Sequence, residues 1–548
     1  MTQTVTTDVS QSIRAARAPQ TALHWQGDPQ QIASDAAGIR DRLAELRSPL
    51  FLLEHAGGIG AASQGEFAAD PALPRIAAWA PALLPSDLGD PAFRETYGLK
   101  YAYMAGAMAN AIASEAMVIE LGRAGMLGSF GSAGVVPSRL EGHVQRVQAA
   151  LPHGPYAFNL IHSPNEPAME RRAVEIFLQY GVRTVEASAF LKLTPSIVYY
   201  RVAGLSQAPD GDVRIKNRVI AKVSRREVAA PFMEPAPAAI LNQLLAEGKI
   251  TAEQAALAAR VPVADDVTVE ADSGGHTDNR PLVGLIPSML ILRDEIQQKY
   301  RYPVPVRVGA AGGISTPAAV LGALMMGAAY VVTGSVNQAC IEAGASAHTR
   351  NLLAQAKMTD VTMAPAADMF EMGVRVQVLK NGTFFPMRAS KLYELYSRYD
   401  SIESIPAEER EKLEKQVFKH TIDEVWAECE RFFAERDPEQ LVRASSKPKQ
   451  KMALIFRWYL GLSSRWSNIG EVGREMDYQI WCGPAIGPFN EWTRGTYLAE
   501  PANRRVVDVA LHLLTGAAYQ SRAHTLELQG MSFPIEVLQY RPEKPMVK

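Results

Sequence analysis

The chain has 548 residues, of which 47% are hydrophobic and 21% charged, a balance typical of globular proteins with a sizeable core. Its formal net charge of −2 gives no reason to expect nucleic acid as a partner. The three cysteines, Cys340, Cys429 and Cys482, lie far apart and form no CxxC or Cys/His pattern. The sequence therefore indicates neither a disulfide framework nor a metal site.

The first residues carry no secretion or membrane signal. Residues 1–20 are rich in Thr, Gln, Ser and Ala and lack an apolar segment, so they are predicted to be a disordered leader. No apolar run reaches the roughly eighteen residues that a membrane helix needs. Together with the few cysteines, this predicts a cytoplasmic protein without a membrane partner. Beyond the leader, short apolar runs such as 49–53 and a glycine cluster at Gly57, Gly58 and Gly60 predict a small N-terminal domain over 21–97.

From Tyr101 onward, strand-like and helix-like segments alternate, which favours parallel β/α units. Eight units over 98–365 predict an α/β fold, a (β/α)8 or TIM barrel. A doubly wound open sheet is the alternative, but its glycine-rich loop usually follows the first strand, whereas here glycines follow the late strands. The strands are expected at 101–104, 126–130, 156–161, 183–187, 220–223 (with 197–202 competing for the fifth place), 267–271, 304–308 and 330–332.

Two further regions are predicted to be helical. A stretch rich in Ala and Leu over about 231–265 is bounded by prolines and is interpreted as a helical insertion above the barrel mouth. Residues 366–548 are predicted to form a mostly helical C-terminal region, in which the apolar residues of 422–433 recur at helical spacing.

Three late strands end in small residues, where a ligand can approach the backbone. These ends are Gly274-Gly275-His276, Ala311-Gly312-Gly313 and Gly334-Ser335. Thr316 as N-cap and Pro317 as first helical residue follow the second end, which favours phosphate binding there, although Gly312 and Gly313 alone also suit a tight turn. Barrels often bind phosphate at these last two loops.

His276 is the titratable group of this region, and histidine exchanges protons near neutral pH. A structural role is the alternative. Asp272 and Asp278 flank it and are candidates to orient the ring, with simple solvation favoured for Asp278. Asn159 ends the third strand and offers an amide to the edge of a flat heterocycle. Lys222 in the fifth strand either faces an anionic ligand or pairs with an acid such as Glu186.

These strand ends resemble the nitronate monooxygenase (2-nitropropane dioxygenase) superfamily, which includes FMN-dependent enoyl reductases, over roughly 99–365. The longer stretches Glu270–Pro281 and Ser464-Arg465-Trp466-Ser467-Asn468 resemble the PfaD family of trans-acting enoyl reductases. Two departures are an Asp-Ser pair at 272–273 where the superfamily has Glu-Ala, and Gly106-Ala107 instead of a double glycine. No cysteine follows the sixth strand, unlike inosine-monophosphate-dehydrogenase barrels.

The resemblance implies FMN as cofactor, NAD(P)H as co-substrate, and reduction of 2-enoyl thioesters on an acyl carrier protein in polyketide or polyunsaturated fatty acid biosynthesis. His276 is the implied proton donor. Nitronate oxidation and a catalytically silent scaffold are the alternatives, and the oligomeric state stays open, a homodimer included. The implied cofactor-binding residues are Ala107, Met108, Asn159, Lys222, Asp272, Gly274, Gly275, Ala311, Gly312, Gly313, Gly334 and Ser335.

A carrier protein is usually acidic, so a basic docking surface is expected. Basic residues cluster between 443 and 465, with two tryptophans among them, although a solvated loop and helix face is the favoured explanation of them. The cluster consists of Arg443, Lys447, Lys449, Lys451, Arg457 and Arg465.

Overall fold

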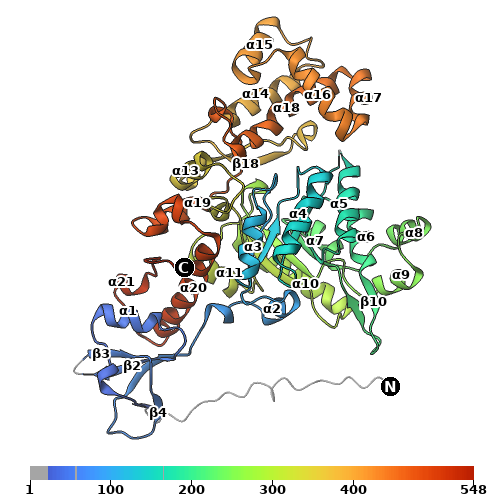
Figure 1. The fold of residues 1–548 in the computed structure, drawn as a ribbon. Coiled ribbons are helices and arrows are strands. Elements are labelled where there is room, and N and C mark those ends of the chain that lie inside the picture. The colour runs from blue at the N-terminus through green and yellow to red at the C-terminus, as the bar shows by residue number, and fades with distance from the viewer. Residues whose placement is uncertain (1–22, 56–57, 165, 548) are drawn as a thin grey trace. The chain divides into compact units, whose positions relative to one another are not determined.

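The computed structural model describes residues 23–55, 58–164 and 166–547, and they form two compact units (Figure 1). The predicted leader over 1–20 and Gly57 lie outside these residues. The smaller unit ends at Leu84 and is completed by Ala518–Tyr540, and the larger unit begins at Pro85. The prediction of 21–97 as one N-terminal domain was therefore wrong at its end, because α2 (Pro91–Tyr97) belongs to the larger unit.

The smaller unit is built around an antiparallel sheet of order β3-β2-β5. Its core combines apolar residues of this sheet with Tyr519, Ala523 and Leu526 from far along the chain. Arg522 lies among them and donates to the carbonyl oxygens of Leu43, Glu45 and Ser48. The elements are β1 (His24–Gln26), α1 (Ala36–Ala44), β2 (Leu50–His55), β3 (Gly58–Ala62), β4 (Glu66–Ala68), β5 (Ile76–Ala80), the end of α20 (Val506–Glu527) and α21 (Ile535–Leu538).

Eight parallel strands close into a barrel in the larger unit, which confirms the predicted TIM barrel. The strands are β6 (Tyr103–Ala105), β7 (Leu127–Phe130), β8 (Ala157–Ile161), β9 (Thr184–Ser188), β12 (Arg218–Val223), β13 (Asp266–Glu270), β15 (Arg307–Ala311) and β16 (Val331–Thr333). The helices that follow them are α3 (Glu115–Arg123), α4 (Pro137–Ala150), α5 (Pro167–Gln179), α6 (Pro195–Ala203), α7 (Arg226–Met233), α10 (Leu282–Tyr300), α11 (Pro317–Met325) and α12 (Ser335–Gln338).

Two strand predictions needed correction. The rival fifth strand over 197–202 lies in α6, capped by the Thr194 side chain. The seventh strand begins later than expected and runs through Gly309 to Ala311. A Cβ at Gly309 would stand 2.3 Å from the ring of Tyr330, so glycine here makes room for that aromatic side chain inside the strand.

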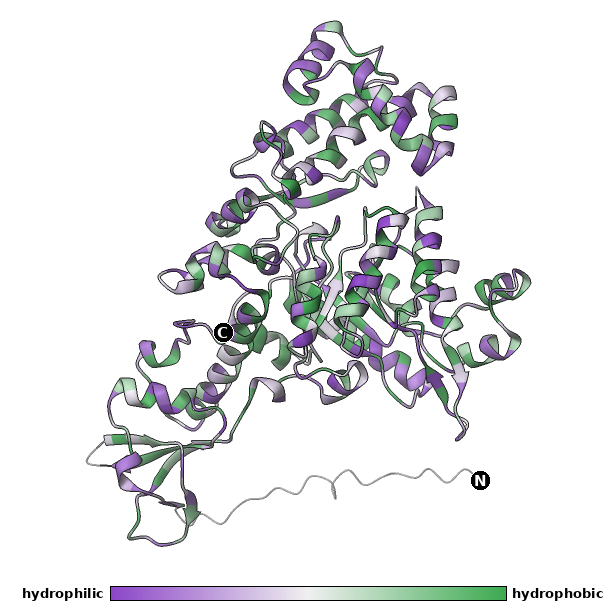
Figure 2. Ribbon diagram, in the orientation of Figure 1, coloured by the Kyte–Doolittle hydropathy of each residue, from purple (hydrophilic) through white to green (hydrophobic). Residues whose placement is uncertain are grey.

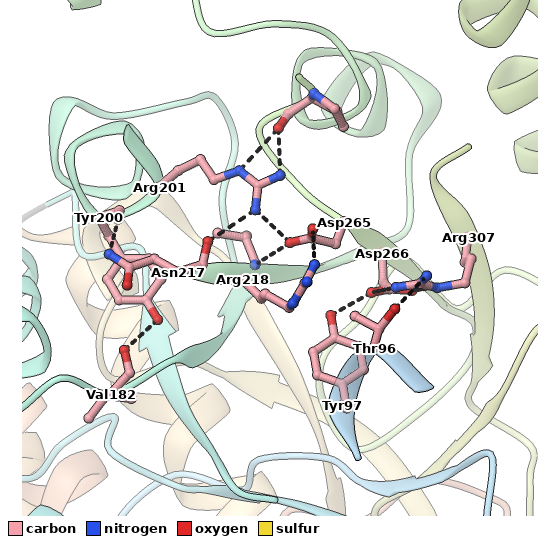
Figure 3. Close-up of polar contacts among 12 residues, drawn as sticks. Thr96, Tyr97, Val182, Tyr200, Arg201, Asn217, Arg218, Asp265, Asp266 and Arg307 are labelled. Atoms are coloured by element: carbon pink, nitrogen blue, oxygen red, sulfur yellow. Dashed lines mark hydrogen bonds and ion pairs between the residues drawn. The ribbon is translucent and has the colours of Figure 1, made fainter. Parts of the chain in front are cut away.

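Acid–arginine pairs join the N-terminal ends of adjacent strands (Figure 3). Asp265 pairs with Arg201 at 2.6 Å and with Arg218 at 2.9 Å. Asp266 accepts hydrogen bonds from both Nε and Nη2 of Arg307, at 2.6 and 2.8 Å. Burial alone would raise the pKa of Asp265, but the two arginines hold it below its usual value. Such a layer at the bottom of a barrel serves stability, which leaves the opposite end for function.

The helical insertion lies away from the barrel mouth. It consists of α8 (Ala238–Ala246) and α9 (Ala252–Ala258), which pack against α6 and against β10 (Leu205–Gln207), the first strand of the hairpin completed by β11 (Val213–Ile215). The expectation that the insertion covers the mouth was wrong, because α7 lies between the end of β12 and the start of the insertion. The chain has already returned along the barrel wall when the insertion begins.

A small sheet and several helices follow the barrel. The sheet has the order β14-β18-β17 and takes its first strand from the predicted site. Hydrophobic and hydrophilic residues alternate along these helices, as amphipathic packing requires (Figure 2). No helix in the described ranges is long and apolar enough to cross a membrane. The elements are β14 (Gly275–His276), α13 (Ala347–Gln355), β17 (Val361–Pro365), β18 (Arg375–Leu379), α14 (Phe385–Arg398), α15 (Ala407–Lys412), α16 (Ile422–Arg436), α17 (Pro438–Ser446), α18 (Pro448–Ile469) and α19 (Ile486–Thr493).

Candidate functional site

A cavity of about 1350 Å³ opens at the C-terminal ends of the barrel strands. Residues of α16, α18 and β18 line its other side, so the C-terminal region covers the barrel mouth. Of the thirteen residues predicted for the site, Asp272 alone does not line the cavity. The others are Ala107, Met108, Asn159, Lys222, Gly274, Gly275, His276, Ala311, Gly312, Gly313, Gly334 and Ser335.

The predicted glycines divide into two kinds. A Cβ added at Gly275, Gly313 or Gly334 would meet nothing within 4 Å, so the backbone there borders open space. A Cβ at Gly312 would stand 2.7 Å from the main chain of Ala271, and one at Gly274 only 3.0 Å from that of Cys482. The first kind leaves open space beside the backbone, whereas the second permits close packing of the chain on itself.

The loop after β6 is held in an unusual conformation. Asn110 and Ala111 both have positive φ, at 56° and 57°, which L-residues rarely adopt. Asn110 donates through its side chain to Ser464 of α18, and its carbonyl oxygen accepts from the Asn468 side chain at 3.4 Å. The backbone N–H of Ala107 donates to Glu186 at 2.8 Å. Helix α18 and a buried acid together fix the shape of this loop.

Lys222 lies between two carboxylates inside the barrel. Its Nζ is 3.5 Å from Glu270 and 3.7 Å from Glu186, whose side chain is fully buried. Burial by itself lowers the pKa of Lys222, but the two acids outweigh it and raise the value to about 12. The predicted alternative of an acid partner is thus present, and the lysine remains charged at the cavity wall.

Asn159 is buried and uses its amide nitrogen within the protein. It donates to the Glu186 carbonyl oxygen at 3.0 Å and to Ser188 Oγ at 2.7 Å. These bonds direct the side chain from β8 toward the neighbouring β9. Its amide oxygen is the atom left for a ligand in the cavity.

His276 pairs with Asp368, a residue that follows β17. Its Nε2 lies 3.2 Å from Asp368 Oδ2, and its backbone pairs with Val376 of β18. Burial lowers the pKa of His276, but the charges of Asp368 and Glu270 raise it by more, so the net pKa stands above the ordinary value. The cavity therefore holds a histidine that tends to be protonated.

The acids expected to orient His276 have other partners, so that expectation was wrong. Asp272 Oδ1 accepts from Asn279 at 2.8 Å and from Gln377 at 2.7 Å. Asp278 forms an ion pair with Arg225 at 2.6 Å, which lowers the pKa of Asp278 to about 2. Asp272 therefore fixes the turn between β13 and β14 and holds it to β18.

Ion pairs join the covering helices to the barrel. Glu166, in the loop between β8 and α5, receives Arg436 of α16 at 2.8 Å and Arg457 of α18 at 3.5 Å. Arg457 also pairs with Glu371 at 3.2 Å. All four side chains are largely buried, so these contacts resist screening by salt.

The basic cluster predicted for docking does not form one free surface. Arg457 is among the buried pairs just described. Lys449 donates to the carbonyl oxygens of Tyr396 and Tyr399, and Lys451 pairs with Glu403 at 3.4 Å. Internal contacts therefore account for half of this cluster.

Several residues of the site were missed. Asp368, Glu166 and Asn110 stand in loops with no motif, and the sequence carries no periodic signal for them. Glu270 could have been predicted from the sequence, because successive side chains of a strand point to opposite faces. Buried Val267 and Val269 share one face of β13, and Glu270 lies on the other.

Comparison with known families identifies the family of this chain. Residues 91–392 match the model described as nitronate monooxygenase. The chain belongs to this family. Residues 25–82 match the N-terminal domain of the fatty acid synthase subunit PfaD, and residues 399–478 match the inserted helical domain of acyl-carrier-protein S-malonyltransferase. The chain therefore combines a nitronate monooxygenase segment with an N-terminal segment similar to that of PfaD.

Relatives of this family member occur in large biosynthetic assemblies. One of the subunits of the polyunsaturated fatty acid synthase of Thraustochytrium sp. is 48% identical over 95% of this chain. The polyketide biosynthesis protein PksE of Bacillus subtilis is 46% identical over 79% of it. The chain spans 34% and 56% of these relatives' own lengths. The enoyl reductase domain of MlnA, from the macrolactin cluster of Bacillus amyloliquefaciens, is 38% identical, with a TM-score of 0.76 over 80% of this chain and all of that domain.

Proposed function

We propose that this protein is a trans-acting enoyl reductase, which reduces 2-enoyl thioesters on an acyl carrier protein with NAD(P)H and a bound FMN. The observation that carries the proposal is the covered cavity of about 1350 Å³ at the barrel mouth. It exceeds the roughly 300–1,000 Å³ of an ordinary small-ligand site. A flavin and a long acyl arm together need such room.

The residues present fit FMN. The open backbone at Gly313 and Gly334 provides a cradle for its phosphate near the N-terminus of α11. Met108 and Ala107 border the space for the ring, and charged Lys222 suits an anionic reduced ring. When bound, FMN would supply the hydride transfer from NAD(P)H to the substrate β-carbon.

His276 is proposed to supply the proton that the substrate α-carbon needs. Asp368 holds its Nε2 and favours the charged imidazolium, so a proton is available near neutral pH. The imidazolium also stabilises the negative charge that develops on the thioester oxygen. Glu270 and Lys222 fix the electrostatic environment on the barrel side.

The substrate assignment rests on the relatives. They belong to polyunsaturated fatty acid and polyketide pathways, in which acyl chains are carried as thioesters. The helical segment 399–478, which resembles a domain of an enzyme acting on acyl carrier protein, contributes α16 and α18 to the cavity. A carrier-borne arm would enter beside these two helices.

The test measures NADPH consumption by the flavin-loaded protein with crotonyl-acyl carrier protein. Turnover supports the proposal, whereas activity only as O2 consumption with an alkyl nitronate would establish nitronate oxidation instead. A protein that purifies without a flavin spectrum would point to the silent scaffold. His276→Ala should retain the flavin and lose enoyl reduction, and full turnover in that variant would remove His276 from the mechanism.

A further inference from the structure

The cavity is positively charged in a slightly acidic protein. Seven cationic side chains and five carboxylates line it, which gives a formal charge of +2, whereas the whole chain carries −2. A cavity of this sign attracts anions. The cations are Arg139, Lys222, Arg225, Arg375, Arg436, Arg457 and Arg465, and the carboxylates are Glu166, Glu270, Asp278, Asp368 and Glu428.

Each of the five carboxylates has a partner within the protein. Four take part in the ion pairs described above, and Glu428 accepts from the Trp458 indole at 2.8 Å. Three of the cations have none: within the described ranges, the guanidinium groups of Arg139, Arg375 and Arg465 make no hydrogen bond or ion pair. All three are exposed at the cavity.

Arg465 differs from its neighbours in the Ser464–Asn468 motif. Ser464 and Asn468 hold Asn110, and Ser467 bonds to Thr349. The Arg474 guanidinium lies over Trp466, 4.2 Å from the centroid of the tryptophan ring. These contacts fix the helix on both sides of Arg465, which lines the cavity and has no partner among the residues that the structure describes. Its guanidinium is therefore available to a ligand that enters the cavity.

We propose that Arg465, with Arg139 and Arg375, binds a phosphate group of a ligand that enters the cavity beside the flavin. A guanidinium group donates two parallel hydrogen bonds to a phosphate, which makes it more specific than an ammonium group. The glycine cradle of the last two barrel loops already serves the flavin phosphate, so these arginines serve a second one. The inference rests on the proposed function, which supplies two bearers: the 4′-phosphopantetheine arm of the carrier and the pyridine nucleotide.

Calorimetric titration of the flavin-loaded protein tests this without turnover. The ligands are 4′-phosphopantetheine against pantetheine, and NADPH against NADH. Arg465→Gln should weaken at least one phosphate-bearing ligand about tenfold, the loss expected for one charge-assisted hydrogen bond. The variant with all three arginines changed to Gln should weaken it further, and pantetheine should be unaffected. Arg443→Gln is the matched control, an exposed arginine of α17 that does not line the cavity.

The ligand that responds identifies the source of the phosphate. A loss of affinity for 4′-phosphopantetheine alone assigns the arginines to the carrier arm. A loss for NADPH, with affinity for NADH unchanged, assigns them to the 2′-phosphate of NADPH. Affinities in the triple variant equal to those of Arg443→Gln would overturn the proposal, as would absence of measurable binding of either ligand to the unsubstituted protein. Failure of the enoyl reductase assay with these arginine effects intact would overturn only the proposed reaction.

Discussion

At the scale of single residues, the pair of His276 and Asp368 couples the barrel to the region that follows it. The histidine comes from β14, the short strand that follows β13, and the aspartate from the segment after β17. Burial raises the pKa of Asp368, but charged His276, a backbone hydrogen bond and Arg457 together outweigh it, so the pKa of Asp368 stands below its usual value. Each group thus stabilises the ionised form of the other.

The pH dependence of this pair has a defined sign. Because the folded pKa of His276 is raised, its stabilising effect is present below the ordinary value of 6.5 and is lost as pH rises through the folded pKa. Enoyl reduction that uses the imidazolium should fall over the same alkaline range. Asp368→Asn removes the main raising charge and should shift this limb to lower pH, as measured by kcat/KM against pH.

The control for that shift is Asp278→Asn. Asp278 lies two residues from His276 but pairs with Arg225, so its loss should leave the alkaline limb in place. Equal limbs in the Asp368 variant and the unsubstituted protein would show that another group controls protonation.

At the scale of elements, the short strand β14 carries the site loop to β18. The position of β14 depends on Gly274, because a Cβ there would stand 3.0–3.1 Å from the backbone of Cys482, in the segment that pairs with β18 through Trp481. Gly483 faces it with equally little room, since its own Cβ would lie 2.7 Å from the Gly274 nitrogen. Two glycines therefore permit two segments to touch through their main chains.

Gly274→Ala should push β14 from the segment around Cys482 and displace His276, with activity falling about a hundredfold, the order expected from a misplacement of about 1 Å. Steady-state kinetics and the flavin spectrum measure this, and the flavin should stay bound. Gly284→Ala in α10 is the matched control, because a Cβ there meets nothing within 4 Å and alanine favours the helix. Unchanged kinetics in Gly274→Ala would contradict the proposed role of this contact.

The same loop marks how far sequence patterns reach. Periodicity identifies strands such as β8 and caps such as Thr316, since both depend on local spacing. The glycines at strand ends likewise indicated the cavity, because they too are a local feature of the sequence. The partner of His276 could not be predicted, because Asp368 lies 92 residues along the chain in a loop without a motif and is brought close only by sheet β14-β18-β17.

At the scale of the larger unit, the covering helices depend on one acid of the barrel. Glu166 forms ion pairs with both Arg436 and Arg457. Without it, the largely buried Arg436 would lose this carboxylate partner, whereas Arg457 would keep Glu371. Glu166→Gln should loosen α16 and speed amide hydrogen exchange in its peptides several-fold, while the barrel strands keep their protection. Glu175→Gln, which removes an exposed pair with Arg172, should leave α16 unchanged.

The composition of the smaller unit has a consequence during synthesis. Strands β2, β3 and β5 emerge from the ribosome early, yet the apolar side of their sheet is covered by Tyr519, Ala523 and Leu526. More than four hundred residues of the larger unit are translated in between. Until then the nascent sheet exposes Leu50 and Leu52, and such surface promotes aggregation. This segment should therefore depend on chaperones that bind nascent chains, and it should be the last part of the protein to fold.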